Sequence, residues 1–144
     1  MVSKKLLLIP VLLILISGSV SAQNKNQDKP WFFIQITDPQ FGMFENNDGF
    51  EKETILYEKA VEKINKLKPD FVVITGDFVH NPDSPDQIAE FKRITAMIDP
   101  EIPVYYTPGN HDLGQTPDEE SLRKYETNYG SDKFSFMHKG SSFI

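Results

Sequence analysis

Short apolar runs alternate with longer amphipathic segments along this chain. The run Trp31–Thr37 is mostly apolar and aromatic, which predicts a strand that is buried on both faces. The runs Phe71–Thr75 and Val104–Tyr106 are rich in β-branched and aromatic residues and indicate two further strands. Turn-forming residues follow each run, so each strand has a defined end.

The amphipathic segments between these runs predict helices. Apolar residues recur at helical spacing in Glu51–Lys68, and Pro69 ends this helix because proline disfavours the α conformation of the residue before it. A second helix opens at Ser84, which suits the N-cap, with Gln87 at the reciprocal position of a capping box. Thr116–Glu119 has the same pattern and predicts a third helix. The buried positions expected in the first helix are Leu56, Tyr57, Ala60, Val61, Ile64 and Leu67.

Two short segments near the end of the sequence extend the pattern. Phe134–Phe136 alternates apolar and polar residues like a strand, Gly140 turns the chain, and Ser142–Ile144 begins another strand. Strands and helices therefore alternate along the chain. This order predicts an α/β fold with a mainly parallel sheet and crossover helices.

Polar side chains follow the three main strands at their carboxyl ends. In open α/β sheets ligands bind outside the carboxyl ends of the strands, where loops that are far apart in sequence meet. Carboxylate, amide and imidazole groups in one place suit a divalent metal ion such as Mn, Fe or Zn. Each residue alone would also suit an ordinary turn, but their occurrence at three successive strand ends favours a site. The candidate residues are Asp38, Gln40, Asp77, Asn110, His111 and Asp112.

The composition narrows the classes of function. The chain has 21 acidic and 15 basic residues and a formal net charge of -6, which argues against binding to a nucleic-acid backbone. It has no cysteine, which excludes disulfides, thiolate catalysis and zinc–thiolate sites. Small phosphorylated substrates stay compatible with this charge, because metal ions can neutralise them.

Residues 1–22 have the layout of a secretory signal peptide. Lys4 and Lys5 precede the apolar stretch Leu6–Ile16, and small residues precede an expected cleavage before Gln23. The stretch is shorter than a membrane span, which needs about 20 apolar residues. An uncleaved anchor is the alternative to cleavage. We expect export by the Sec route to the periplasm or the extracellular space, with residues 23–30 as a spacer and 31–144 as the domain.

Three motifs carry a family resemblance. Asp38-Pro-Gln40, Gly76-Asp77 and Gly109-Asn-His-Asp112 resemble the first three motifs of the calcineurin-like metallophosphoesterases. The resemblance covers residues 31–144 and implies the N-terminal half of a four-layer α/β/β/α fold. It also implies a metal-dependent hydrolase of phosphoesters, either a phosphatase or a phosphodiesterase. Gln40 stands where most of the family has His, and Thr37–Gly42 is similar to a subgroup with Asp-Pro-Gln at this point.

The resemblance implies a role for each candidate residue and two divalent metal ions. Asp38 and Gln40 would bind the first ion, Asp77 would bridge both ions, and Asn110 would bind the second. His111 would act as general acid or stabilise the phosphoryl charge. Asp112 would orient His111 and so fix its tautomer.

Two other histidines have plainer interpretations. His80 lies near the site, and we expect it to be a loop residue in contact with solvent rather than a ligand. His138 follows the alternating segment, and we expect it to be a structural or surface residue.

The family pattern also requires a later His and a Gly-His-x-His motif, which this sequence does not contain. We therefore expect a fragment that lacks the second sheet of the fold, leaves an apolar sheet face poorly covered and has little or no hydrolytic activity. The alternative is a half-domain that holds a metal ion or a partner without catalysis. An unrelated nucleotide-binding domain is disfavoured, because no Gly-x-Gly-x-x-Gly or Walker loop follows any strand.

Overall fold

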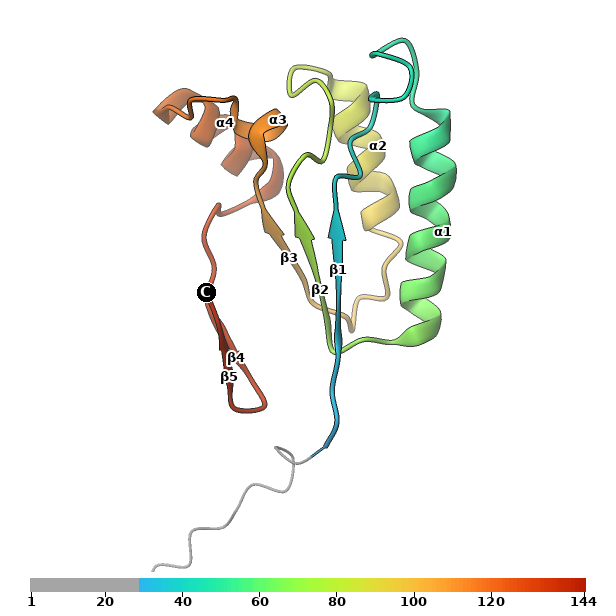
Figure 1. Cartoon of the computed structure of the whole chain (residues 1–144), viewed down its shortest axis with the longest axis vertical. Coiled ribbons are helices and arrows are strands. Elements are labelled where there is room, and N and C mark those ends of the chain that lie inside the picture. Colours follow the sequence, from blue (N-terminus) through green and yellow to red (C-terminus); the bar gives the residue numbers. More distant parts are fainter. Residues whose placement is uncertain (1–28) are drawn as a thin grey trace, which may run out of the picture.

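The computed structural model describes residues 29–144, and a three-stranded parallel sheet lies at its centre (Figure 1). The strands are β1 (Phe33–Thr37), β2 (Phe71–Thr75) and β3 (Val104–Thr107), in the order β1-β2-β3. The pairing aligns the last residues of all three strands, so the strands end at one level. The α/β fold with crossover helices is therefore confirmed. The expected signal peptide lies outside the described residues.

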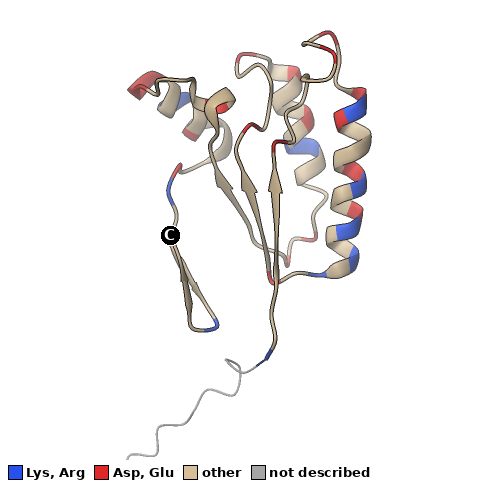
Figure 2. Cartoon of the chain, in the orientation of Figure 1, with Lys and Arg blue, Asp and Glu red and all other residues tan. Residues whose placement is uncertain are grey.

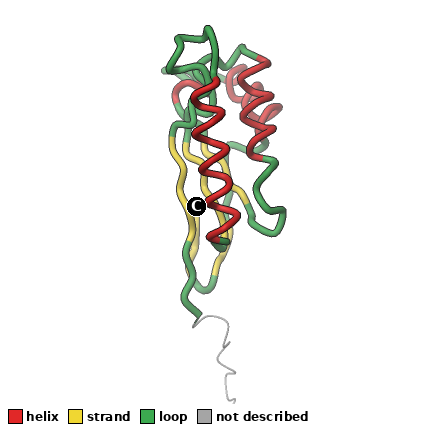
Figure 3. Tube along the Cα trace, turned by 90° about the vertical axis from the view of Figure 1, so that its right-hand side faces the viewer, coloured by secondary structure: helices red, strands yellow, loops and turns green. Residues whose placement is uncertain are grey.

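Two long helices cover one face of the sheet. α1 (Glu51–Leu67) connects β1 to β2, and α2 (Pro85–Thr95) connects β2 to β3. α1, α2 and the three strands run along the long direction of the molecule, with the loops that follow β1 and β2 at one end (Figures 1 and 3). The single turn α3 (Asn110–Leu113) and the helix α4 (Glu119–Tyr129) follow β3. Among the residues described, no helix has the length and apolar character needed to cross a membrane.

The hydrophobic core lies between the sheet and these helices. Tyr57 of α1 stacks on Phe91 of α2 with ring centroids 5.8 Å apart, and Phe91 stacks in turn on Phe78 at 4.8 Å. Tyr125 of α4 is also buried and packs against the same cluster. Burial of this apolar and aromatic surface is the main favourable contribution to the stability of the fold.

The expected apolar stripe of α1 is partly wrong. Leu56 and Leu67 are 56% and 57% exposed, whereas Tyr57, Val61 and Ile64 are buried. The helix is rotated so that these three residues face the sheet. The periodicity alone did not resolve the rotation, because apolar residues occupy more than half a turn.

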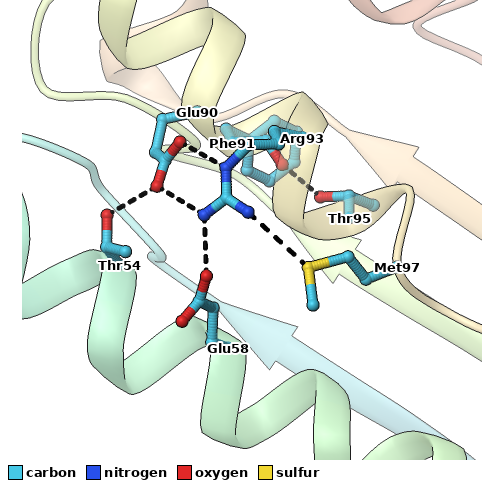
Figure 4. A network of polar contacts seen from close by, with 7 residues as sticks. All are labelled: Thr54, Glu58, Glu90, Phe91, Arg93, Thr95 and Met97. Atoms are coloured by element: carbon cyan, nitrogen blue, oxygen red, sulfur yellow. Dashed lines mark hydrogen bonds and ion pairs between the residues drawn. The ribbon is translucent and has the colours of Figure 1, made fainter.

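An ion-pair network joins the exposed sides of α1 and α2 (Figure 4). Arg93 donates hydrogen bonds of 2.7 Å to Glu90 and to Glu58, and Thr54 donates one of 2.9 Å to Glu90. The two carboxylates raise the pKa of Arg93, and Arg93 lowers the pKa of Glu90. Because the network is open to solvent, it aligns the helices more than it stabilises them.

Both expected capping boxes need correction. Ser84 does cap α2 by accepting a hydrogen bond from the Gln87 N–H, but the Gln87 side chain bonds Asn81 and Asn47 instead of the cap. The helix expected at Thr116 begins at Glu119, where the N-cap is Asp118 and its partner is Ser121. In α4 neighbouring polar residues thus replace the expected pair, whereas in α2 the expected N-cap is present and the reciprocal bond from Gln87 is missing.

The last two strands form a separate hairpin and do not extend the main sheet as expected. β4 (Phe136–His138) pairs antiparallel with β5 (Ser141–Phe143), and Gly140 lies in the turn with φ 88°. Phe136 and Phe143 pack edge-on against Phe71 of β2, with ring centroids 5.1 and 5.0 Å away. The hairpin therefore covers the sheet face that points away from the helices.

Asp70 fastens this hairpin to the sheet. Its Oδ1 accepts hydrogen bonds from His138 Nε2 at 2.9 Å and from Lys139 Nζ at 2.7 Å, and its Oδ2 accepts one from the Phe32 N–H. The bond from Lys139 lowers the pKa of the Asp70 carboxyl. The prediction that His138 is a structural residue agrees with these contacts.

The burial expected for β1 is wrong. Ile34 and Ile36 pack against the core, whereas Phe33, on the opposite face, is 41% exposed. β1 is an edge strand, and within residues 29–144 no strand pairs with its outer edge. The expectation of a poorly covered apolar face is thus met at Phe33 but not at Phe71, which is 1% exposed beneath the hairpin.

Candidate metal centre

The loops that follow β1 and β2 are held against each other at the carboxyl edge of the sheet. The Asp38 N–H donates to the carbonyl of Gly76 at 3.3 Å, and the Gln40 N–H donates to the carbonyl of Asp77 at 2.9 Å. A parallel bridge between Phe41 and Val79 continues this pairing beyond the strands. Figure 2 shows acidic segments in red just beyond the ends of the strands. The first two predicted groups of ligands therefore lie on adjacent, mutually bonded loops.

The backbone of these loops is strained. Asp38, Gln40 and Asp77 have positive φ angles of 51°, 34° and 45°. Residues other than glycine seldom adopt such angles, and they persist where the surrounding hydrogen bonds enforce them. Strain of this kind is concentrated at functional sites, and here it falls on three of the predicted ligands.

Two glycines bring the loop that follows β3 against Asp77. A Cβ on Gly109 would lie 2.2 Å from Asp77 Oδ1, and a Cβ on Gly76 would lie 2.9 Å from the Gly109 Cα. Gly76 also has φ +67°, which favours glycine on its own account. Side chains at either position would force the two loops apart, so the glycines set the distance between Asp77 and the loop that carries Asn110 and His111.

Asp77 joins the second and third loops through a hydrogen bond. Its Oδ1 accepts the His111 N–H at 2.8 Å, and Asp77 is 8% exposed. This bond fixes one oxygen of the carboxylate next to the start of α3. Asn110, the first residue of α3, is exposed to solvent at the same place.

Asp112 is buried, and among residues 29–144 its carboxylate bonds only to backbone groups. Its Oδ1 accepts the Phe78 N–H at 3.0 Å and its Oδ2 accepts the Gly109 N–H at 2.8 Å. Burial raises the pKa of Asp112 to about 6, with a further contribution from the charge of Asp77. Asp112 therefore ties the loop after β2 to the start of α3.

The prediction that Asp112 orients His111 is wrong. His111 Nδ1 lies 2.9 Å from the backbone carbonyl oxygen of His80, so the imidazole donates this hydrogen bond through Nδ1–H. In the neutral ring the lone pair then lies on Nε2. A backbone carbonyl fixes the tautomer that we had assigned to a carboxylate.

His80 is closer to the site than the sequence suggested. Its ring stacks on that of His111 with centroids 4.8 Å apart, and its Nδ1 lies 3.5 Å from Gln40 Nε2. The available signal was its position three residues after Asp77, on the same loop. The motif pattern assigns that position no role, and the expectation of a loop residue in contact with solvent is incomplete, because His80 also contacts Gln40 and His111.

The donor set fits a divalent cation only in part. Asp38, Gln40, Asp77 and Asn110 offer carboxylate and amide oxygens, which suit hard divalent ions. Within residues 29–144, no three Asp, Glu or His side chains gather as a group that could hold a metal ion. The described residues therefore supply some ligands of a metal centre but not a full set from acidic and imidazole side chains.

Comparison with known proteins identifies the family. The model of the calcineurin-like phosphoesterases matches residues 33–143. The chain belongs to the calcineurin-like phosphoesterase family.

Curated relatives and a solved structure agree with this assignment. The chain is 35% identical over 139 residues to the serine/threonine-protein phosphatase CPPED1 of Bos taurus, an alignment that covers 86% of this chain and 44% of that protein. It is 37% identical over 130 residues to CPPED1 of Homo sapiens, covering 80% and 41% of the two chains. The crystal structure of a dimetal phosphatase from Danio rerio superposes with a TM-score of 0.51 at 17% identity, covering 69% of this chain and 34% of that one.

The family match covers the segment that carries the candidate residues. All six predicted site residues fall inside the matched range, and the superposition supports the phosphoesterase fold. The chain spans less than half the length of the curated relatives that it matches. Within that span it carries the three loops described above, which hold Asp38, Asp77 and Asn110.

Proposed function

We propose that this chain carries part of a metal-dependent phosphoesterase site. One observation carries the proposal: in a calcineurin-like phosphoesterase chain, Asp38, Asp77 and Asn110 lie on three consecutive loops tied together at one edge of a parallel sheet. Asp38 and Gln40 would hold one divalent ion, Asp77 would hold both ions, and Asn110 would hold the second. Two divalent ions, of Mn, Fe or Zn, would neutralise the charge of the phosphoryl group and hold the reacting oxygens in place.

The residues of this chain would orient the phosphoester and handle one proton. His111 carries its Nδ1 proton toward the carbonyl of His80, which leaves Nε2 for the substrate. From Nε2 a protonated imidazole could donate a proton to the leaving-group oxygen or stabilise the phosphoryl charge. Asp112 would act at a distance by holding the backbone of the loop, because its oxygens bond Phe78 and Gly109.

The names of the curated relatives, and not the geometry of the site, favour a phosphomonoester as the substrate class. The curated relatives are named serine/threonine-protein phosphatases, which makes phosphoserine and phosphothreonine peptides the first substrates to try. The formal net charge of -6 disfavours nucleic-acid backbones, because their phosphates carry charge of the same sign.

A second candidate is a half-domain that binds metal without turnover. The observation that favours it is the shortage of acidic and imidazole ligands within residues 29–144. Metal would then bind weakly, and the ions would not be held closely enough to position the reacting oxygens.

Metal binding and hydrolysis, measured on the same protein, test the proposal. Mn²⁺ would be titrated calorimetrically, and release of phosphate from p-nitrophenyl phosphate would be followed with Mn²⁺ present. We expect Mn²⁺ binding that Asp77→Asn abolishes, and at most slow hydrolysis, in keeping with the expected low activity, which His111→Ala should abolish while leaving Mn²⁺ binding intact. Asp86→Asn, on the exposed first turn of α2, is the matched control and should change neither.

The possible results separate the two candidates. Binding without detectable hydrolysis would favour the half-domain. Absence of Mn²⁺, Fe²⁺ and Zn²⁺ binding by the folded wild-type chain would refute both candidates. Hydrolysis that persists in His111→Ala would refute only the role proposed for the His111 imidazole.

We also propose that the chain is exported through the Sec route. The basic start and the apolar stretch Leu6–Ile16, followed by small residues, support this proposal. Expression in a bacterial host followed by mass spectrometry of the periplasmic fraction tests it. A mature N-terminus at Gln23 is expected, and intact protein in the membrane fraction would instead indicate an anchor.

A further inference from the structure

Gln40 is buried and bonds to the protein through one end of its amide. It is 8% exposed, and its Nε2 lies 3.5 Å from His80 Nδ1. Within the described part of the chain, Gln40 Oε1 accepts no hydrogen bond from another residue. An amide has one end that can bind a cation, the oxygen, and one end that cannot, the NH₂ group. The direction in which this amide is turned therefore decides whether Gln40 can act as a ligand.

In the structure the Nε2 end of the Gln40 amide, and not the Oε1 end, is turned toward His80 Nδ1. The NH₂ group of an amide can only donate, so His80 Nδ1 must accept and the ring proton must lie on Nε2. In the opposite orientation, Oε1 would accept from a proton on His80 Nδ1, and the NH₂ group would occupy the place of the ligand oxygen. The tautomer of His80 and the orientation of the Gln40 amide therefore determine each other.

The position of His80 is itself fixed by three contacts. Its N–H donates to the carbonyl of Phe41 at 2.9 Å, next to Gln40. Its carbonyl accepts Nδ1–H of His111 at 2.9 Å, and its ring stacks on the ring of His111. His80 therefore contacts His111 through both its carbonyl and the face of its ring, while its Nδ1 lies toward Gln40.

We propose that His80 is a positioning residue that turns the Gln40 amide so that its oxygen is available to a divalent ion. This inference rests on the proposed function, in which Gln40 is a ligand of the first ion. His80 does not touch the ion or the substrate. His80 is not itself a ligand. Its Nδ1 accepts a hydrogen bond from the NH₂ group of Gln40 and so holds the amide with its oxygen toward the ion.

The metal-free protein provides the first test, because the tautomers do not depend on a bound ion. Two-bond ¹H–¹⁵N correlation spectra of the imidazoles would be recorded about two pH units above the usual histidine pKa of about 6.5, so that the rings are neutral. The chain has 3 histidines, which keeps the assignment simple. We expect His80 with its proton on Nε2 and His111 with its proton on Nδ1.

A variant of Gln40 shows whether the bond to His80 exists. In Gln40→Ala the Nδ1 resonance of His80 should move, because the nitrogen loses its donor, while His138, bonded to Asp70, should stay unchanged. A proton on Nδ1 of His80 in the wild-type chain would overturn the proposal. An Nδ1 resonance that does not respond to Gln40→Ala would overturn it as well.

Two conservative variants test the consequence for metal binding. The amide of asparagine reaches the place of Nδ1 of a histidine, and the amide of glutamine reaches the place of Nε2. His80→Asn should therefore keep the affinity for Mn²⁺, whereas His80→Gln and His80→Ala should weaken it by about tenfold or more, the usual effect of removing a residue that orients a ligand. Equal weakening by His80→Asn and His80→Gln, or no weakening by His80→Ala, would contradict the proposal. If the wild-type chain binds no metal, the proposed function fails, and the tautomers in the metal-free protein still decide the role of His80.

Discussion

The two faces of the sheet are buried in different ways. The face toward α1 and α2 is closed, with Tyr57, Phe91 and Ile94 between 0% and 4% exposed. The opposite face is covered by the β4–β5 hairpin over Phe71, while Phe33 on the neighbouring edge strand is 41% exposed. Two parallel neighbouring strands need a crossover connection, and its helix necessarily packs on one face of the sheet. The cover on the other face depends on a short segment that aromatic contacts and one carboxylate hold in place.

The two faces should therefore differ in how much they stabilise the domain and in how readily they open. The closed face should set the cooperative unfolding of the domain, because it contains most of the buried apolar side chains. The hairpin face should open locally at lower free energy, because its cover consists of two three-residue strands that do not pair with the main sheet. The predictions below compare the two faces directly.

Phe91→Ala should have the largest effect. Phe91 is 1% exposed and lies between the rings of Tyr57 and Phe78, so its removal leaves a cavity in the closed face. We expect the free energy of unfolding to fall by about 3–5 kcal/mol, measured by urea titration. A loss smaller than that caused by Phe136→Ala would show that the closed face does not dominate stability.

Phe136→Ala should have an intermediate and more local effect. Phe136 is half-buried and stacks on Tyr105 at 4.0 Å and on Phe143 at 4.9 Å. Loss of this partial burial should cost about 1–2 kcal/mol. In hydrogen exchange, the amides of residues 136–143 should exchange faster while those of β2 stay protected. Uniform acceleration across the sheet would contradict a separately opening hairpin.

Asp70→Asn should have the smallest effect, and one that depends on pH. The contacts with Lys139, Phe32 and His138 lower the pKa of Asp70 below 3.8, so its charged form stabilises the folded state above that pH. The variant should be less stable at pH 7 by up to about 1 kcal/mol, as for an exposed ion pair. The difference should shrink as the pH falls through the lowered pKa, because the native carboxyl then becomes protonated. Urea midpoints at about pH 7 and pH 3 measure it, and a difference that does not change between them would contradict this account.

The sequence predicted the main elements and missed how they are buried. Patterns in Phe71–Thr75 and Glu51–Lys68 identified a strand and a helix, because apolar spacing reports local conformation. The same patterns could not show that β1 lies at an edge or that Leu56 points to solvent. Those outcomes depend on which elements become neighbours, and a local pattern does not contain that information.

The candidate site was predictable in its location but not in its contacts. Three strand ends placed Asp38, Asp77 and Asn110 at one edge of the sheet, because parallel strands share that edge. The partner of His111 was not predictable, because every residue has a backbone carbonyl and the sequence does not mark which one accepts a bond. The prediction of Asp112 as the partner is wrong for this reason. The positive φ angle of Gln40 was not predictable either, since only Gly, Asn, Asp and His are common at such angles, and most Asp residues do not adopt them.

The order β1-β2-β3 has a consequence for how the domain assembles during synthesis. Each new strand is added beside the one made just before it, so every pairing joins neighbouring parts of the chain. Such an order keeps the entropic cost of each closure small and allows the sheet to form from β1 onward as the ribosome releases the chain. Asn110 and His111 emerge only after β1, β2 and β3, so the three loops at the carboxyl edge can meet only once the whole sheet has been made.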